Sequence, residues 1–259
     1  MFKRLYPLLF LVLLSMQVKA QTIMPVKLAD GSSKEVLVLP DNYQLDSSIE
    51  EIASVKNGKG IFRNYGDFKP QLEKVVQKAA AKGGNVFRIS RIHDKGQQGI
   101  YDLAGDVFSA ADYDRLKAKA LEIKSKKLEQ NKYAFLVIYR PVYSHGHNDE
   151  ISFKITVNDT LSLEMKANTK YIIKLANEAR IKLVAGDTDV MQPLFVDVKR
   201  GNTYYVRGFS SYPYLRKRLK KSNERIRVDG YKPYLLPTDE LQGELESSTV
   251  TWITLKRTL

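Results

Sequence analysis

The stretch LFVDVKRGNTYYVR, residues 194–207, decides the fold class of this 259-residue chain. In its first half, Val196 and Val198 alternate with Asp197 and Lys199. A two-residue period of this kind is typical of a strand with one buried face, because successive side chains of a strand point to opposite sides. The pattern predicts that the two valines enter a core and that the two charged residues face solvent.

A turn and a second strand are expected to follow. Gly201 and Asn202 interrupt the alternation, and both residue types accept the positive φ that a tight reversal requires. Residues 203–206 (TYYV) then resume with aromatic and β-branched side chains, which suit a pleated and partly buried surface. We therefore expect residues 194–207 to form one β-hairpin.

Similar short runs extend from Tyr133 to the C-terminus. Turn residues separate them, and no long helical pattern intervenes. Many short strands at such spacing are typical of an antiparallel β-sandwich, which we predict for residues 132–259. The expected strands cover residues 133–139, 151–157, 160–165, 170–175, 180–184, 194–198, 203–207 and 250–255.

The N-terminal part, residues 21–108, is predicted to be a smaller β-α-β-β module with a helix on an antiparallel sheet. Two strand-like runs, 35–39 and 49–55, precede the helix, and two more, 86–92 and 100–108, follow it. Gly83 and Gly84 end the helix, since glycine accepts the left-handed conformation that closes many helices. The apolar stripe of the helix has a helical period and comprises Leu72, Val75, Val76, Ala79 and Ala80.

A basic helix over residues 109–131 is expected to connect the two modules. Its buried line comprises Tyr113, Leu116, Ala120 and Ile123. We place the domain boundary near Asn131. The predicted fold class is therefore α+β, with an N-terminal β-α-β-β module, a connecting helix and a C-terminal antiparallel β-sandwich.

Residues 1–20 have the three parts of a secretory signal peptide. Lys3 and Arg4 supply the positive start, residues 8–14 (LLFLVLL) supply the apolar core, and Ala20 ends a small-x-small site. The apolar run is shorter than the roughly 20 residues that cross a bilayer. We expect cleavage after Ala20 and export to the periplasm or the cell exterior.

The chain contains no cysteine. This composition excludes disulfides, thiol catalysis and thiolate metal sites. The core must therefore stabilise an exported protein without covalent cross-links, and a chain of this length can supply such a core.

Four segments of the second module resemble, in order, an exported bacterial family of unknown function. They are AFLVIYRP at 134–141, ISFKITVND at 151–159, KYIIKLA at 170–176 and LFVDVKRGNTYYVRG at 194–208. The family combines a "vYRP" strand, a "vNg" hairpin, an aromatic-rich strand and a "GktYYvr" motif, and it is similar to PEGA-type β-sandwiches of bacterial surfaces and envelopes. The resemblance spans residues 133–208 and implies a sandwich fold and an envelope location, with no assigned catalytic residue.

Two features depart from that family. Asn158-Asp159 stands where a glycine turn is usual, and the lipid-carrying cysteine of many such proteins is missing. In the N-terminal module, KAAAKGGNVFRISRI at 78–92 resembles small exported α+β modules, a short likeness that implies no chemistry.

A basic segment provides the candidate binding residues. Residues 216–227 carry seven basic side chains and one acidic one, while the whole chain has a net charge of +13, or +10 without residues 1–20. We expect a basic loop over residues 210–237 in which tyrosines bracket the charge and could stack on bases or sugars. The candidate anion-binding residues are Arg216, Lys217, Arg218, Lys220, Lys221, Arg225 and Arg227, and the candidate stacking residues are Tyr212, Tyr214, Tyr231 and Tyr234. The alternative, which we favour, is a solvated loop that its tyrosines hold to the sheet.

Catalytic candidates are few. His145 and His147, with Asp149, lie on a predicted loop and lack a third ligand at a regular spacing, so a polar turn is the simpler interpretation. Asp102 and Asp106 share one face of a predicted strand, which fits solvated positions better than paired catalytic carboxylates. The sequence contains none of the catalytic, cofactor-binding or metal-binding motifs that would indicate an enzyme.

From the sequence we expect a non-catalytic exported binding or structural component of the bacterial cell envelope. Its expected partner is an envelope protein or an anionic glycan or lipid surface, and nucleic acid is disfavoured. The alternatives are a polyanion or anionic-surface binder that uses residues 216–227, and an unrecognised metal-dependent hydrolase.

Overall fold

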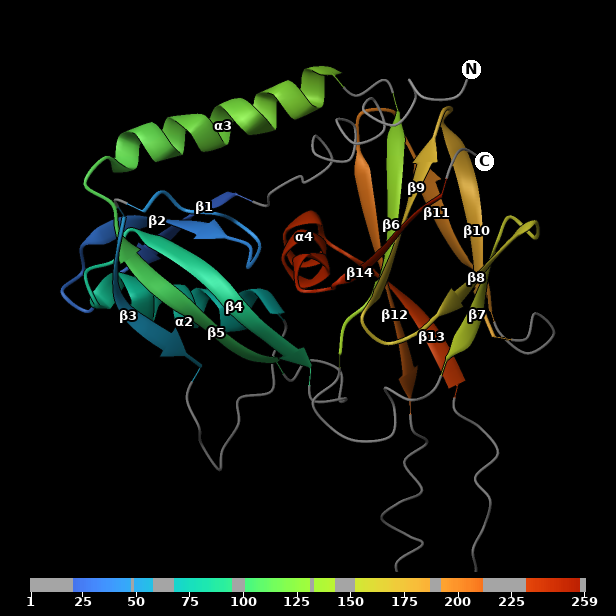
Figure 1. Cartoon of the computed structure of the whole chain (residues 1–259), viewed down its shortest axis with the longest axis horizontal. Helices are drawn as coiled ribbons and strands as arrows, with labels where there is room; N and C mark the ends of the chain where they lie inside the picture. Colours follow the sequence, from blue (N-terminus) through green and yellow to red (C-terminus); the bar gives the residue numbers. More distant parts are fainter. Residues whose placement is uncertain are drawn as a thin grey trace, which may run out of the picture.

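The computed structural model describes residues 21–47, 49–57, 68–94, 101–130, 133–142, 152–186, 192–211 and 232–256. These residues form a β-rich α+β protein with three sheets and three helices (Figure 1). The expected signal peptide, the boundary at Asn131, the loop histidines His145 and His147, and the basic segment 216–227 lie outside the described residues.

The first module contains one five-stranded sheet in the order β1-β2-β4-β5-β3. β4 and β5 pair antiparallel as predicted, whereas β2 and β4 run parallel, so the expected all-antiparallel sheet is wrong. The parallel pair arises because the chain leaves β2 and returns to its neighbour through a crossover that contains a helix. β1 was not expected and pairs antiparallel with β2. The strands are β1 (Thr22–Lys27), β2 (Ser33–Leu39), β3 (Glu50–Lys56), β4 (Val86–Asp94) and β5 (Tyr101–Ser109).

A helix covers each face of this sheet. α2 (Phe68–Ala81) buries its whole predicted stripe, and Gly83 closes it with a φ of +92° while its N–H donates to the Ala80 carbonyl. α3 (Tyr113–Gln130) packs on the opposite face through Ala120. β2 is consequently buried on both sides: Val36 and Val38 belong to the core under α2, and Leu37 and Leu39 to the core under α3.

The second module contains two sheets that share one core, which makes it sandwich-like. The four-stranded sheet has the order β11-β10-β7-β8, and the five-stranded sheet has the order β13-β12-β6-β9-β14. Leu136 and Ile173 of one sheet pack in the same cluster as Ile155 and Leu183 of the other. The strands are β6 (Ala134–Arg140), β7 (Phe153–Val157), β8 (Leu161–Met165), β9 (Thr169–Leu175), β10 (Ala179–Ala185), β11 (Leu194–Val198), β12 (Thr203–Ser211), β13 (Lys232–Thr238) and β14 (Trp252–Lys256).

Residues 194–207 do not form a hairpin. β11 pairs with β10 in one sheet, whereas β12 pairs with β6 and β13 in the other. Gly201, with a φ of +81°, lies in the turn that leads from one sheet to the other. The N–H of Gly201 donates a hydrogen bond to the Tyr133 carbonyl near the start of β6. The predicted faces are confirmed, since Val198 is buried, Val196 is half-buried against the same core, and Asp197 and Lys199 are exposed. Alternation reports which side of a strand is buried, but not which strand it pairs with.

Three further expectations need correction. The sandwich is not purely antiparallel, because β12 runs parallel to β6 and β14 parallel to β9. The expected loop 210–237 is shorter, since its ends belong to β12 and β13 and pair as far as Ser211 and Lys232. β13 was not expected, and the short helical turn expected after Asp239 is a full helix, α4 (Glu240–Ser248).

The turn between β7 and β8 explains how the chain does without the glycine usual in the resembled family. Asn158 and Asp159 have φ values of 49° and 59°, and the Thr160 N–H donates to the Val157 carbonyl, so residues 158–160 form a tight turn with two left-handed residues at its centre. Asn and Asp adopt this conformation more readily than other non-glycine residues.

Candidate functional site

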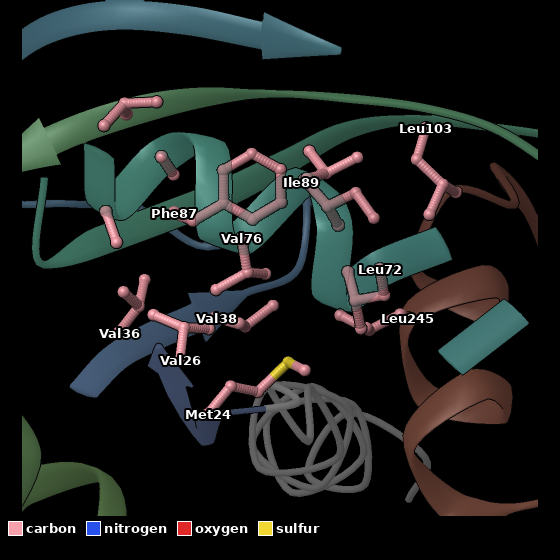
Figure 2. Close-up of a cluster of buried hydrophobic side chains, with 14 of the residues drawn as sticks. Met24, Val26, Val36, Val38, Leu72, Val76, Phe87, Ile89, Leu103 and Leu245 are labelled. Carbon is pink, nitrogen blue, oxygen red and sulfur yellow. The ribbon is translucent and has the colours of Figure 1, made fainter. Parts of the chain in front are cut away.

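α4 lies between the first sheet and the five-stranded sheet (Figure 1). Asp239 caps its N-terminus by accepting a hydrogen bond of 2.8 Å from the Gln242 backbone N–H. Leu245, which is fully buried, belongs to the core of the first module and lies beside Leu72 of α2 (Figure 2). A helix that follows the second module in sequence therefore completes the core of the first.

The other side of α4 rests directly on β12. A Cβ atom added at Gly243 would overlap the Cβ and ring atoms of Tyr205, so only glycine allows this approach. Tyr205 is itself buried, and burial, with the carboxylates of Glu244 and Glu240, raises the pKa of its phenol well above the ordinary value. The helix is thus held between two packed surfaces.

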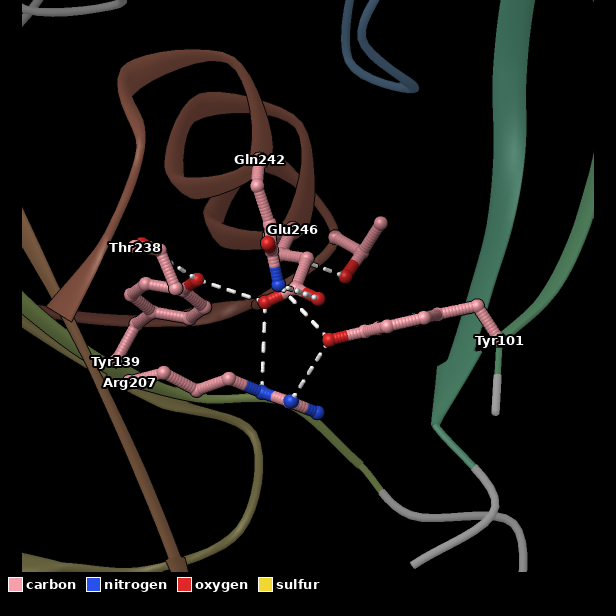
Figure 3. A network of polar contacts seen from close by, with 7 residues as sticks. Tyr101, Tyr139, Arg207, Thr238, Gln242 and Glu246 are labelled. Atoms are coloured by element: carbon pink, nitrogen blue, oxygen red, sulfur yellow. Dashed lines mark hydrogen bonds and ion pairs between the residues drawn. The ribbon is translucent and has the colours of Figure 1, made fainter. Parts of the chain in front are cut away.

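A polar network lies at this junction, and we call it the inter-module cluster. It draws side chains from four strands and from α4 (Figure 3). Four of its members (all except Thr238 and Gln242) are at most 8% exposed. The cluster comprises Tyr101, Tyr139, Arg207, Thr238, Gln242 and Glu246.

The Glu246 carboxylate is the centre of the cluster. One oxygen accepts a hydrogen bond of 2.7 Å from the Tyr139 hydroxyl and lies 3.4 Å from Nε of Arg207. The other accepts a hydrogen bond of 3.0 Å from Nε2 of Gln242. A buried charge requires this degree of pairing, because an unpaired one would carry a large desolvation cost. Since the Tyr139 proton goes to Glu246, the Thr238 hydroxyl, 3.3 Å away, is the donor to Tyr139.

Tyr101 brings the first module into the cluster. Its phenolic oxygen accepts hydrogen bonds from Nη1 of Arg207 at 3.1 Å and from Nε2 of Gln242 at 2.8 Å. Its ring packs edge-on against Phe68 at the start of α2, with ring centroids 5.3 Å apart. One side chain therefore joins the hydrophobic core of the first module to the only buried ion pair found among the described residues.

The contacts of this cluster link the two modules. Burial, and then the Glu246 carboxylate, keep the pKa of Tyr139 well above its usual value, so its hydroxyl remains a donor. Arg207 contacts partners on both sides of the junction, namely Tyr101 and Glu246. Two hydrogen bonds of the cluster, from Arg207 and from Gln242 to Tyr101, cross the junction.

A buried lysine lies at the C-terminal end of α4. Lys170 of β9 is 8% exposed, and its Nζ donates a hydrogen bond of 2.6 Å to the Ser247 carbonyl in the last turn of the helix. A cation is favourable there because the C-terminal carbonyls carry partial negative charge. Burial nevertheless lowers the pKa of Lys170 from 10.5 to about 8.

The arginine of the "YRP" motif has a different role. Arg140 is fully buried at the end of β6, where its guanidinium lies 5.1 Å from the centre of the Phe153 ring. Its Nη1 donates a hydrogen bond of 3.1 Å to the Met165 carbonyl. It therefore connects the two sheets of the sandwich-like module.

Of the residues singled out in the sequence, few lie within the described structure. Tyr234 lies on β13, is 39% exposed and stacks on Phe209 with ring centroids 5.4 Å apart. Asp102 and Asp106 are half-buried and pair with Arg91 at 3.6 Å and Arg88 at 2.9 Å, so they are not a free carboxylate pair. The remaining stacking and anion-binding candidates belong to residues 212–231, which lie outside the described chain. His145, His147 and Asp149 lie outside it as well.

Sequence reasoning missed the inter-module cluster, although one local signal points to α4. Leu241 and Leu245 have helical spacing behind the Asp239 cap, which would extend the expected turn into a helix. Glu246 and Arg207 look like ordinary surface charges in the sequence, because their burial depends on two modules meeting.

Comparison of the chain with models of protein families, with curated proteins and with solved structures finds no match. Within the described ranges, no helix is both long and apolar enough to span a membrane, and no group of three or more His, Cys, Asp or Glu residues could hold a metal ion.

Glu246→Gln should destabilise the protein by about 3 kcal/mol, because it leaves Arg207 buried without its counter-charge. Urea unfolding followed by circular dichroism measures this change. Glu240→Gln removes the same charge from an exposed position on the same helix and should cost less than about 1 kcal/mol. Equal losses from the two variants would contradict the role given to Glu246.

Lys170 should make stability depend on pH. Because the unfolded chain holds its proton up to about 10.5 and the folded chain only up to about 8, the stabilising contribution is complete above pH 10.5 and is lost as the pH falls through 8. From about pH 7 to about pH 9 the wild type should gain roughly 1 kcal/mol relative to Lys170→Met. The exposed Lys154→Met is the control and should keep the wild-type pH profile in the same urea titrations.

Proposed function

We propose that this chain is a non-catalytic exported component of the bacterial cell envelope that binds or positions other envelope molecules. The observation that carries the proposal is the inter-module cluster. A buried ion pair, Arg207–Glu246, lies at the junction of the two modules, and Arg207 and Gln242 both donate to Tyr101 across it. This arrangement fits a rigid body that presents surfaces to partners.

The sequence supports the location and the type of module. Residues 1–20 have the pattern of a cleavable signal peptide, and residues 133–208 resemble an exported family with a PEGA-like sandwich. We propose accordingly that residues 21–108 form one module, that 109–131 connect it, and that 132–259 form a PEGA-like domain. The two sheets around one core and the buried Arg140 of the "YRP" motif support this assignment.

Export can be tested directly. In a bacterial host, mass spectrometry of the protein from the envelope fraction should show a chain that begins at Gln21. Leu11→Arg places a charge in the apolar run and should leave the full-length chain in the cytosolic fraction, whereas Lys3→Arg keeps the positive start and should not. A wild-type protein that keeps Met1 and stays in the cytosol would refute the envelope assignment.

A second candidate function, binding to polyanions or anionic surfaces, is favoured by the position of the basic segment. β12 and β13 pair as far as Ser211 and Lys232, so the two described residues that flank segment 212–231 lie side by side at one end of the sheet. Tyr234, stacked on Phe209, lies on the strand that follows this segment. Seven basic residues are therefore confined to one connection between neighbouring strands.

If this segment binds polyanions, heparin should bind the wild type and dissociate as salt increases. With six or more contacts, affinity should fall by about 10³ or more between roughly 50 and 200 mM salt, because neutralised polyanions release counterions. Replacing Lys217, Arg218, Lys220 and Lys221 by Gln should flatten this dependence. The control replaces four exposed lysines elsewhere by Gln: Lys69, Lys74, Lys119 and Lys154. A salt response equal in both variants, or no binding to heparin or anionic vesicles at low salt, would exclude the segment as the site.

A further inference from the structure

One edge of the five-stranded sheet remains open in the described structure. β14 is the last strand of the order β13-β12-β6-β9-β14 and pairs with β9 alone (Figure 1). An unpaired strand edge presents a row of backbone N–H and C=O groups that can accept a further strand. β14 therefore has the backbone requirement for strand addition.

The register identifies the groups that point outward. The Trp252 N–H donates a hydrogen bond of 3.1 Å to the Asn168 carbonyl, on the β9 side. Because the peptide groups of a strand alternate in direction, the N–H and C=O of Ile253 point away from β9, toward the open edge. Those of residue 255 follow the same direction by the same alternation.

Two large apolar side chains flank this edge. Trp252 is 72% exposed and Ile253 is 57% exposed. As neighbours on a strand they lie on opposite faces of the sheet, so an added strand would find an apolar neighbour on each face. Exposed apolar side chains beside an unpaired backbone are a common feature of peptide-binding sheet edges.

The other five sheet edges among the described strands are protected. Pro and charged residues on an edge oppose strand addition, because Pro cannot donate and a charge is costly to cover unless the added strand carries the opposite charge. Each of these edges contains a Pro or an acidic residue, whereas β14 (WITLK) contains neither, and its one charged residue, Lys256, is the last of the strand, where an acidic segment would match it. The protective residues are Pro25 on β1, Glu50 and Glu51 on β3, Glu164 on β8, Asp197 on β11, and Pro233 and Pro237 on β13.

The charge near β14 indicates which kind of added strand this edge would bind, a second copy of the chain or a segment of another protein. Residues 249–259 contain Lys256 and Arg257 and no acidic residue, and the chain as a whole carries +13. A second copy would bring two basic edges together, whereas an acidic segment would be attracted. We propose that β14 binds an extended segment of another protein in which apolar and acidic residues alternate, and that this segment adds to the sheet as a sixth strand. This binding does not depend on where the protein is located.

Fluorescein-labelled eight-residue peptides that alternate Glu with Val, Ile, Tyr or Phe provide the probe, with binding followed by fluorescence anisotropy. At least one of them should bind the wild type. Ile253→Pro should weaken this binding tenfold or more, because it removes an outward N–H without removing a bond to β9. Trp252→Ala should weaken it severalfold. The same peptide with N-methyl groups at alternate residues, or with Lys in place of Glu, should not bind.

Two controls distinguish backbone pairing at this edge from charge attraction and from side-chain contact. Binding should persist when Lys217, Arg218, Lys220 and Lys221 are replaced by Gln, which excludes attraction to the basic segment. Ile253→Thr keeps the backbone donor and should retain binding better than Ile253→Pro. If Ile253→Pro fails to fold, the N-methylated peptide still tests the backbone pairing.

Three results would overturn the proposal. The first is that none of the peptides binds the wild type. The second is that a peptide binds the wild type, Ile253→Pro and Trp252→Ala equally, or binds equally when N-methylated. The third is a concentration-dependent dimer of the wild type, measured by analytical ultracentrifugation, that Ile253→Pro abolishes, because a second copy would then occupy the edge.

Discussion

The burial of the Glu246 carboxylate is the constraint on which the arrangement of this protein depends. A charge with no exposed surface must be matched from several directions, and the partners come from β6, β12 and α4 itself. Arg207, one of these partners, also donates to Tyr101 of the first module. The hydrophobic contacts of Leu245 and the close approach of Gly243 to Tyr205 position α4 for this pairing. The two modules are therefore joined by the packing of Leu245 in the first core and by the hydrogen bonds of Arg207 and Gln242 to Tyr101.

A shared junction has consequences for function. When two modules are fixed relative to one another, the surfaces that they present keep a constant separation and direction. The open edge of β14 and the sheet end at which Ser211 and Lys232 pair belong to one five-stranded sheet, and α4, which contacts this sheet, fixes the first module relative to both. This geometry suits a component that positions partners, which is why we prefer it to a catalytic role.

Much of the fold could be predicted from periodicity. The stripe of α2 and the buried face of β11 follow from local patterns, because they depend on which side of an element is apolar. The pairing of β4 with β5 was expected for another reason, namely that the two strands are consecutive in the sequence. Pairing partners could not be predicted in this way, as the separation of β11 and β12 into different sheets demonstrates. The site was missed for a related reason: Glu246 and Arg207 are ordinary charged residues until two modules enclose them. Tyr139 lies in the "YRP" run that the resemblance singles out, but the sequence does not reveal its partner.

Native-state hydrogen exchange tests most directly whether the two modules form one cooperative unit. Amides of β4 in the first module and of β6 in the second should open with the same free energy in the wild type. Glu246→Gln should lower both values by the same amount, because the junction stabilises both modules. Protection that falls in β6 while β4 is unchanged would mean that the modules unfold independently, and would contradict the account.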